Sequence, residues 1–163
     1  MHINHIGIAF GVAAGARRFH RLEEGLGYVA GLGYRLVEMN PHSLAMIVNG
    51  AIRQDVLADF VAVLRNFDLR YTIHGLNRLN LAYDPRHDLC KQIMRCQLEV
   101  CRAVGAGVLV YHSGLQALDQ VQYGVRRTLL SDYELLVGAE QEVAALRELS
   151  LLALDTLKGI APW

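Results

Sequence analysis

Two short apolar segments that each end in a histidine constrain the fold of this chain most strongly. Residues 69–75 read LRYTIHG and residues 107–114 read GVLVYHSG, so each run stops at a histidine, His74 or His112, with a glycine within two residues. Such a run is typical of a buried parallel strand. Because ligands of α/β folds bind at the carboxyl ends of parallel strands, the pattern predicts a functional site that contains both imidazoles.

The rest of the chain alternates between short apolar runs and longer segments with helical periodicity. Strands are predicted at 4–10, 34–39, 69–74 and 108–112, and helices at 16–32, 54–67, 86–104 and from 131 onward. This alternation predicts an α/β fold in which parallel strands are joined by right-handed crossovers. A chain of 163 residues, 53% of them hydrophobic, suffices for one domain with a sizeable core.

Two segments are less clearly determined. Residues 131–134 (SDYE) form a capping box that opens a helix. This helix either continues to Lys158 or ends near Glu148, in which case residues 149–154 form a fifth strand that ends at Asp155. Leucine and alanine favour the continuous helix, and no turn residue separates the two parts. The apolar segment 44–50 is predicted to fold over a site or to pack at an interface.

Charge and cysteine content argue against several classes of protein. Lys and Arg number 16, as do Asp and Glu, so the chain lacks the overall basic charge that favours nucleic-acid binding. The three cysteines lie in one predicted helix without a CxxC pair, which favours reduced thiols and a cytoplasmic location. No segment resembles a signal peptide or a membrane span, so we expect no membrane partner.

Three segments together resemble a known superfamily. The segments GYRLVEMN (33–40), IHGLNRLNLA (73–82) and LVYHSG (109–114) are similar to the xylose isomerase-like TIM barrels. That superfamily includes sugar-phosphate isomerases and epimerases and the endonuclease IV type of apurinic endonuclease (AP endonuclease family 2). The resemblance covers only the first half of the barrel, which usually needs about 250 residues. It therefore implies a partial TIM barrel of about four βα units, with residues 1–163 forming one truncated domain.

The resemblance also implies a function and a set of site residues. It implies a sugar or sugar-phosphate isomerase or epimerase that acts on a small sugar or polyol with a divalent metal (Zn, Mn or Mg). His74 and His112 match zinc ligands of the endonuclease IV branch, whereas in many isomerase-like members these histidines lie close to the substrate. Asp155 could replace a strand-5 ligand only if residues 149–154 form a strand. Glu38 is expected either to bind a sugar hydroxyl or to orient a histidine, and Asn77 to offer amide hydrogen bonds to a polyol.

Each candidate residue also has an ordinary structural explanation. A histidine can be hydrogen-bonded in a loop, a carboxylate can cap a loop, and asparagine is a common turn former. His42, which follows Pro41, is expected to be a loop residue. Tyr111 precedes His112 and should point to the opposite face of its strand, where it would pack under the helices.

A half-barrel would leave sheet edges and an apolar inner face uncovered. Self-association into a two-fold homo-oligomer is the simplest way to cover them. The alternative function is therefore a non-catalytic half-barrel that self-associates, while zero net charge argues against an apurinic-site nuclease.

Overall fold

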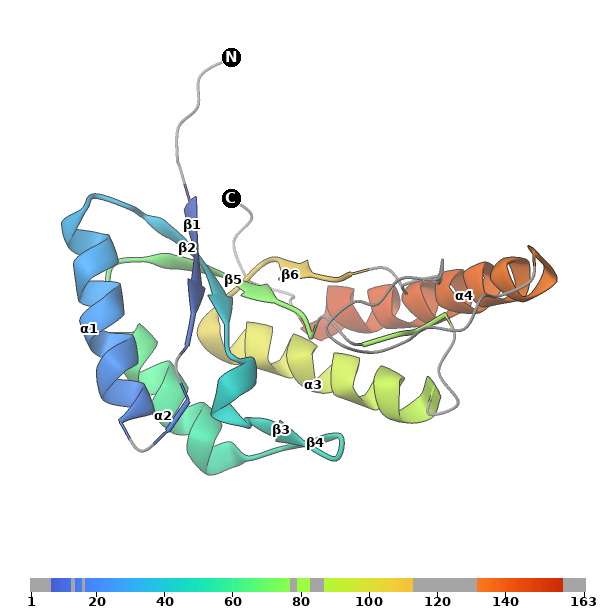
Figure 1. The fold of residues 1–163 in the computed structure, drawn as a ribbon, viewed down its shortest axis with the longest axis horizontal. Helices are drawn as coiled ribbons and strands as arrows, with labels where there is room; N and C mark the ends of the chain where they lie inside the picture. The colour runs from blue at the N-terminus through green and yellow to red at the C-terminus, as the bar shows by residue number, and fades with distance from the viewer. Residues whose placement is uncertain are drawn as a thin grey trace, which may run out of the picture.

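A four-stranded parallel sheet forms the centre of the fold in a computed structural model of the chain (Figure 1). The structure describes residues 7–12, 14–15, 17–76, 79–82, 87–112 and 132–156. The strands are β1 (Gly7–Gly11), β2 (Leu36–Asn40), β5 (Arg70–His74) and β6 (Leu109–Val110), and they lie side by side in this order. All three neighbouring pairs are parallel.

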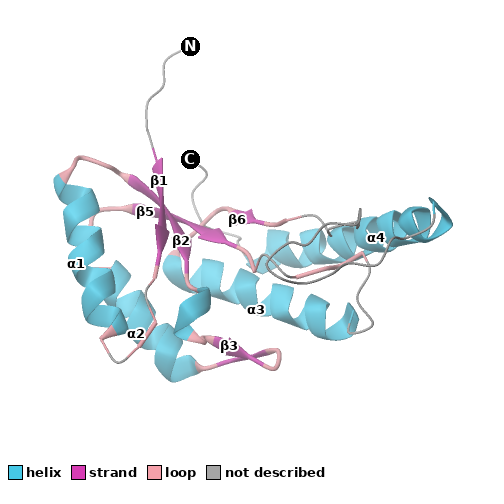
Figure 2. Cartoon of the chain, in the orientation of Figure 1, coloured by secondary structure: helices cyan, strands magenta, loops and turns pink. Residues whose placement is uncertain are grey.

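Helices alternate with these strands along the chain (Figure 2). They are α1 (Arg18–Gly31), α2 (Gln54–Leu64), α3 (His87–Val104) and α4 (Asp132–Thr156). A parallel sheet whose spatial order follows the chain order is the arrangement of consecutive βα units in a TIM barrel. The predicted α/β class, with a four-stranded parallel sheet and alternating strands and helices, is confirmed.

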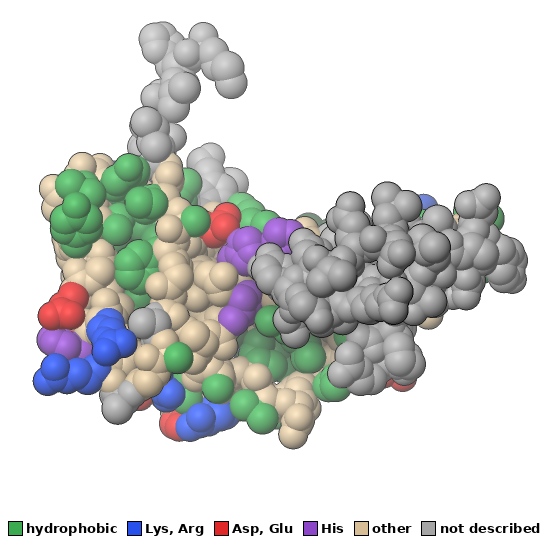
Figure 3. Space-filling view, in the orientation of Figure 1, with side chains coloured by type: hydrophobic (Ala, Val, Ile, Leu, Met, Phe, Trp, Pro, Cys, Tyr) green, Lys and Arg blue, Asp and Glu red, His purple; other side chains and the backbone are tan. Residues whose placement is uncertain are grey.

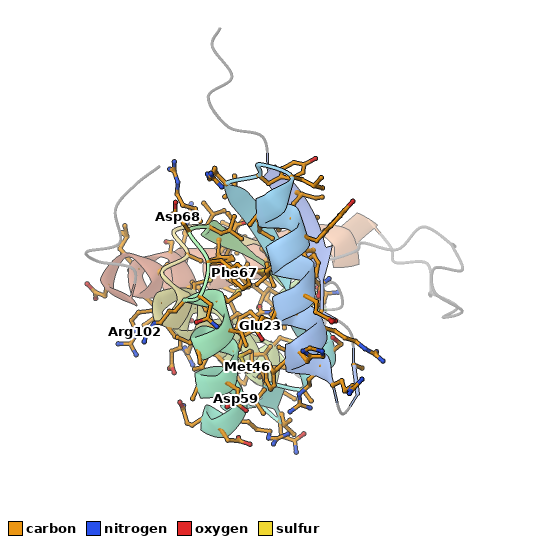
Figure 4. The ribbon with its side chains drawn as sticks, turned by 90° about the vertical axis from the view of Figure 1, so that its left-hand side faces the viewer. Glu23, Met46, Asp59, Phe67, Asp68 and Arg102 are labelled. Atoms are coloured by element: carbon orange, nitrogen blue, oxygen red, sulfur yellow. The ribbon has the colours of Figure 1, made fainter. Side chains whose placement is uncertain are left out.

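Alternation along the strands separates the hydrophobic core from an open face. Val37 and Met39 of β2 and Tyr71 and Ile73 of β5 are buried against the helices. Their helical neighbours in the same core are also fully or almost fully buried and include Leu22, Leu26, Phe60 and Leu64. Figure 4 shows α1 and α2 side by side on this face of the sheet. The intervening residues of the strands, among them Glu38, point to the other face.

Helix α4 is continuous over residues 132–156, so the alternative of a fifth strand at 149–154 is wrong. Leucine and alanine propensity, without an intervening turn residue, accounts for this result. The helix packs along α3. Ala145 and Leu149 of α4 contact Cys90 and Met94 of α3 in a second cluster of buried side chains, called the α3–α4 cluster below. Glu148 forms ion pairs with Lys91 and Arg95 of α3, both at 2.5 Å.

The segment between β2 and α2 folds into two small elements that were not predicted. A 3-10 helix, η1 (His42–Leu44), is followed by a hairpin of β3 (Ile47–Val48) and β4 (Ala51–Ile52). Its two-residue turn is Asn49-Gly50, and both residues have positive φ, as a type I′ turn requires. Leu44 and Met46 are buried in the core, so this apolar segment packs against the fold.

The amino end of α2 holds this segment in place. The amide of Arg53 donates to the carbonyl of Met46 over 2.8 Å, and Met46 is seen close to α2 in Figure 4. Ser43 donates a hydrogen bond to the carbonyl of Val12 after β1. No helix in the described part of the chain is long and apolar enough to cross a membrane.

Candidate functional site

A chain of hydrogen bonds links three side chains at the carboxyl end of the sheet. Nδ1 of His74 lies 2.7 Å from Oε1 of Glu38, and Nε2 of His74 lies 2.9 Å from Nε2 of His112. The three residues come from β2, the end of β5 and the segment just after β6. The structure therefore brings together both predicted histidines and one predicted substrate-binding carboxylate. Figure 3 shows histidine side chains beside an acidic side chain on the visible face.

Glycine after His74 lets the two histidine-bearing strands approach each other closely. The amide of Gly75 donates to the carbonyl of Val110 over 2.8 Å. A Cβ atom at residue 75 would lie 2.4 Å from that carbonyl oxygen, so any other side chain would push the strands apart. The His-Gly pair thus ends β5 and sets the spacing at which His74 meets His112.

Glu38 determines how His74 can act. An ionised carboxylate only accepts hydrogen bonds. The hydrogen of this bond is therefore on Nδ1 of His74, which donates the hydrogen bond to Glu38. In the neutral ring, Nε2 then holds a lone pair and accepts from Nε2–H of His112. A hydrogen between two imidazoles can belong to either ring. The arrangement is therefore that of a general acid–base pair whose charged form is stabilised by a carboxylate.

His42, which was expected to be a loop residue, lies beside these three hydrogen-bonded side chains. Its Nε2 donates to the carbonyl of Gly75 over 3.0 Å, and its ring centroid is 6.3 Å from that of His74 in an edge-on arrangement. Burial lowers the pKa of His42, and the nearby His74 charge acts in the same direction. Its position directly after β2 was a signal for the site, because the carboxyl ends of parallel strands meet.

The other predicted residues fall elsewhere. Asn77 lies outside the described residues. Asp155 is exposed near the end of α4, so the strand that would have placed it at the site does not form. Tyr111 packs with the α3–α4 cluster and donates to Oε1 of Glu142 over 2.6 Å, which confirms that it faces away from His112.

The donor set at the site is smaller than a metal centre requires. His74 and His112 offer facing imidazole nitrogens, and Glu38 binds the far side of His74, as an outer-shell carboxylate does. Zinc sites use three or four protein ligands. Within residues 7–156, as far as they are described, no group of three or more His, Cys, Asp or Glu is placed to hold a metal ion. The described residues thus do not complete a metal site.

Comparison with known proteins supports the fold. No protein-family model matches the chain, and no curated protein matches it. A solved structure of D-psicose 3-epimerase with D-tagatose, from Clostridium cellulolyticum H10, superposes with a TM-score of 0.63 at 15% sequence identity. The match covers 93% of this chain and 49% of that chain, so the present chain spans about half the length of the solved protein. At this identity the likeness shows the fold alone.

Proposed function

We propose that this chain is a sugar isomerase- or epimerase-like protein that moves a proton next to a sugar carbonyl. The observation behind the proposal is the Glu38–His74–His112 chain of hydrogen bonds at the carboxyl ends of three neighbouring strands. The substrate class follows from the sequence resemblance and from the fold shared with a sugar epimerase. A small ketose or polyol is the expected ligand.

The proposed reaction starts with a substrate that replaces the direct contact between the two imidazoles. Nε2 of His74 accepts the proton from the carbon next to the carbonyl, and the electron pair of that C–H bond forms an enediolate. Glu38 stabilises the resulting imidazolium through Nδ1–H. Return of the proton to the same face of that carbon regenerates the substrate, return of a proton to the opposite face gives the epimer, and delivery to the former carbonyl carbon gives the isomer. His112 is placed to donate to the substrate oxygen that becomes charged.

Deuterium exchange from D2O tests this proposal more sensitively than product formation. A panel of small ketoses that includes D-tagatose and D-psicose is incubated with the full chain, and NMR follows loss of the proton next to the carbonyl. We expect protein-dependent exchange that falls at least about 100-fold in His74→Ala. In Glu38→Gln, where the carboxylate is lost but its shape is kept, we expect a loss of about 10- to 100-fold.

The chain contains a matched control for these variants. His20 and Glu24 form a second His–Glu pair, with Nε2 and Oε1 3.3 Å apart, exposed on α1. His20→Ala and Glu24→Gln should leave exchange unchanged. If the whole panel shows no exchange with the wild-type protein, or if His74→Ala exchanges as fast as wild type, the proposal is wrong.

The divalent metal implied by the resemblance is tested separately. Elemental analysis of the purified protein and of His74→Ala shows whether Zn, Mn or Mg is retained. Near-stoichiometric metal that falls in the variant would mean that residues beyond the described set complete a site around His74. Deuterium exchange that persists in the presence of a chelator would mean that His74 and His112 act without a metal.

A second candidate function is that of a self-associating half-barrel without catalysis. The observation that favours it is a hollow of about 280 Å³ on the face of the sheet opposite the helices, with Leu36, Val108 and Val110 among its lining residues. Apolar side chains on an open sheet face favour a partner. A second copy of the chain is the partner we propose.

A further inference from the structure

A small pocket lies on the helix-facing side of the sheet, next to His42. Its volume is about 100 Å³. The walls include Ile73 of β5, Ile93 and Val100 of α3, and Met46 and Ile47 of the segment that leads into the hairpin. Ile73 points to the helices, whereas Glu38 points to the other face of the sheet. The pocket therefore lies on the opposite face of the sheet from Glu38, while His42, which also lines it, borders the proposed site.

One polar atom in the lining of this pocket has no hydrogen-bond partner among the described residues. Gln97 of α3 lines the pocket and is 4% exposed. Among the described residues, its Oε1 is a buried side-chain atom without a hydrogen bond. Buried polar atoms are nearly always hydrogen-bonded, so one without a partner is unfavourable. His42, the other polar side chain of the lining, binds the carbonyl of Gly75 through its Nε2. The open acceptor on Gln97 thus points to a donor on a bound molecule.

We propose that this pocket binds a small uncharged molecule with a short hydrocarbon part and one hydroxyl donor, such as a simple aliphatic alcohol. The hydroxyl donates to Oε1 of Gln97, and the hydrocarbon lies against Ile73, Ile93 and Val100. The pocket is somewhat smaller than an engineered cavity of about 150 Å³ that holds benzene in another protein, so the ligand is small. A ligand with several hydroxyl groups fits less well, because Gln97 and His42 are the polar side chains that the described lining offers.

Two isomeric ligands distinguish the contribution of the hydrogen bond to Gln97 from that of the hydrocarbon contacts. 1-Butanol and diethyl ether have the same atoms and nearly the same size, but only the alcohol has a hydroxyl donor. Each is titrated into methyl-labelled full-length protein and followed by NMR. We expect saturable shifts of the Ile73, Ile93 and Val100 methyl signals. We also expect the ether to bind about two- to tenfold more weakly, which is the effect of one neutral hydrogen bond.

Variants on α3 test the role of Gln97. In Gln97→Leu the acceptor is removed at similar volume, and the alcohol should lose its preference over the ether. Gln92→Leu is the control, because Gln92 lies on the same helix and donates instead to the carbonyl of Gly50 over 3.2 Å. This control should keep the preference for the alcohol.

Several outcomes would overturn the proposal. They are shifts that do not saturate, equal binding of alcohol and ether to the wild type, or an alcohol preference that survives in Gln97→Leu. A bound water on Gln97 that butanol fails to displace would also overturn it, because water alone would then satisfy the acceptor. If Gln97→Leu does not fold, the comparison of the two ligands on the wild-type protein still decides.

Discussion

At the scale of single residues, two tyrosine hydroxyls anchor different parts of the fold. The hydroxyl of Tyr71 donates to the carbonyl of Leu64, the last residue of α2, over 3.0 Å. The hydroxyl of Tyr111 donates to the carboxyl group of Glu142, which is 8% exposed. The second bond involves a charged acceptor, and hydrogen bonds to charged groups are stronger than those between neutral groups.

Tyr111→Phe should therefore destabilise the protein more than Tyr71→Phe. We expect losses of about 1.5–3 kcal/mol for the bond to the charged Glu142 and about 0.5–1.5 kcal/mol for the bond to the Leu64 carbonyl. Urea denaturation of both variants measures the difference in unfolding free energy. Equal losses would show that the Glu142 carboxyl group is satisfied without Tyr111.

The pKa of Tyr71 also predicts how the free energy of unfolding changes at alkaline pH. Burial raises the pKa of Tyr71 from 10.0 to about 12. Between these values the native state holds a proton that the unfolded state has released, so unfolding free energy falls as pH rises from about 10 to about 12. Denaturation measured across this range should show the decline, and Tyr71→Phe should make it shallower. An unchanged slope in the variant would contradict this assignment.

At the scale of elements, α4 is bound to α3 through one narrow face. Leu149 is 4% exposed and belongs to the α3–α4 cluster, whereas Leu151, two residues further, is 69% exposed. The same substitution at the two positions thus separates packing from helix propensity. Leu149→Ala should cost about 2–5 kcal/mol because it leaves a cavity. Leu151→Ala should change stability by no more than about 0.5 kcal/mol.

Denaturation of the two leucine variants checks this prediction. If Leu149→Ala and Leu151→Ala are equally stable, α4 does not rest on α3 through Leu149. If unfolding of α4, seen as loss of helical circular dichroism, precedes unfolding of the sheet, then α4 is a separate cooperative unit.

The elements differ in how far the sequence determined them. Strand β5 and His74 were predictable, because an apolar run that ends in His-Gly fixes both the strand and its end. Tyr111 was predictable from alternation alone. The β3–β4 hairpin was missed although Asn49-Gly50 is a strong turn signal, because its strands have only two residues each. His42 could have been assigned to the site from its place after β2, but its edge-on contact with His74 and the lack of a described partner for Oε1 of Gln97 depend on tertiary packing, which no local pattern encodes.

At the scale of the whole molecule, the sheet has one covered and one open face. Helices α1 and α2 pack on the first, while the second contains the hollow with Leu36, Val108 and Val110 in its lining. A stable homo-oligomer interface typically buries at least about 1,200 Å². Two open sheet faces brought together by a two-fold axis would bury apolar surface on both copies, because such an interface pairs the same patch with itself.

We therefore expect the full chain to be a dimer that dissociates when the open face is made charged. Val108 is 39% exposed on this face, and Val48, which is 44% exposed on β3, is its matched control. In Val108→Asp each interface would contain two unpaired carboxylates, which oppose burial, so sedimentation should show a shift to monomer. Val48→Asp should remain dimeric. A compact wild-type monomer at every concentration would contradict closure by a second copy. If Val108→Asp still forms dimers, the interface lies elsewhere on the molecule. The exposed leucines of α4, Leu136 and Leu154, would then be the next residues to test.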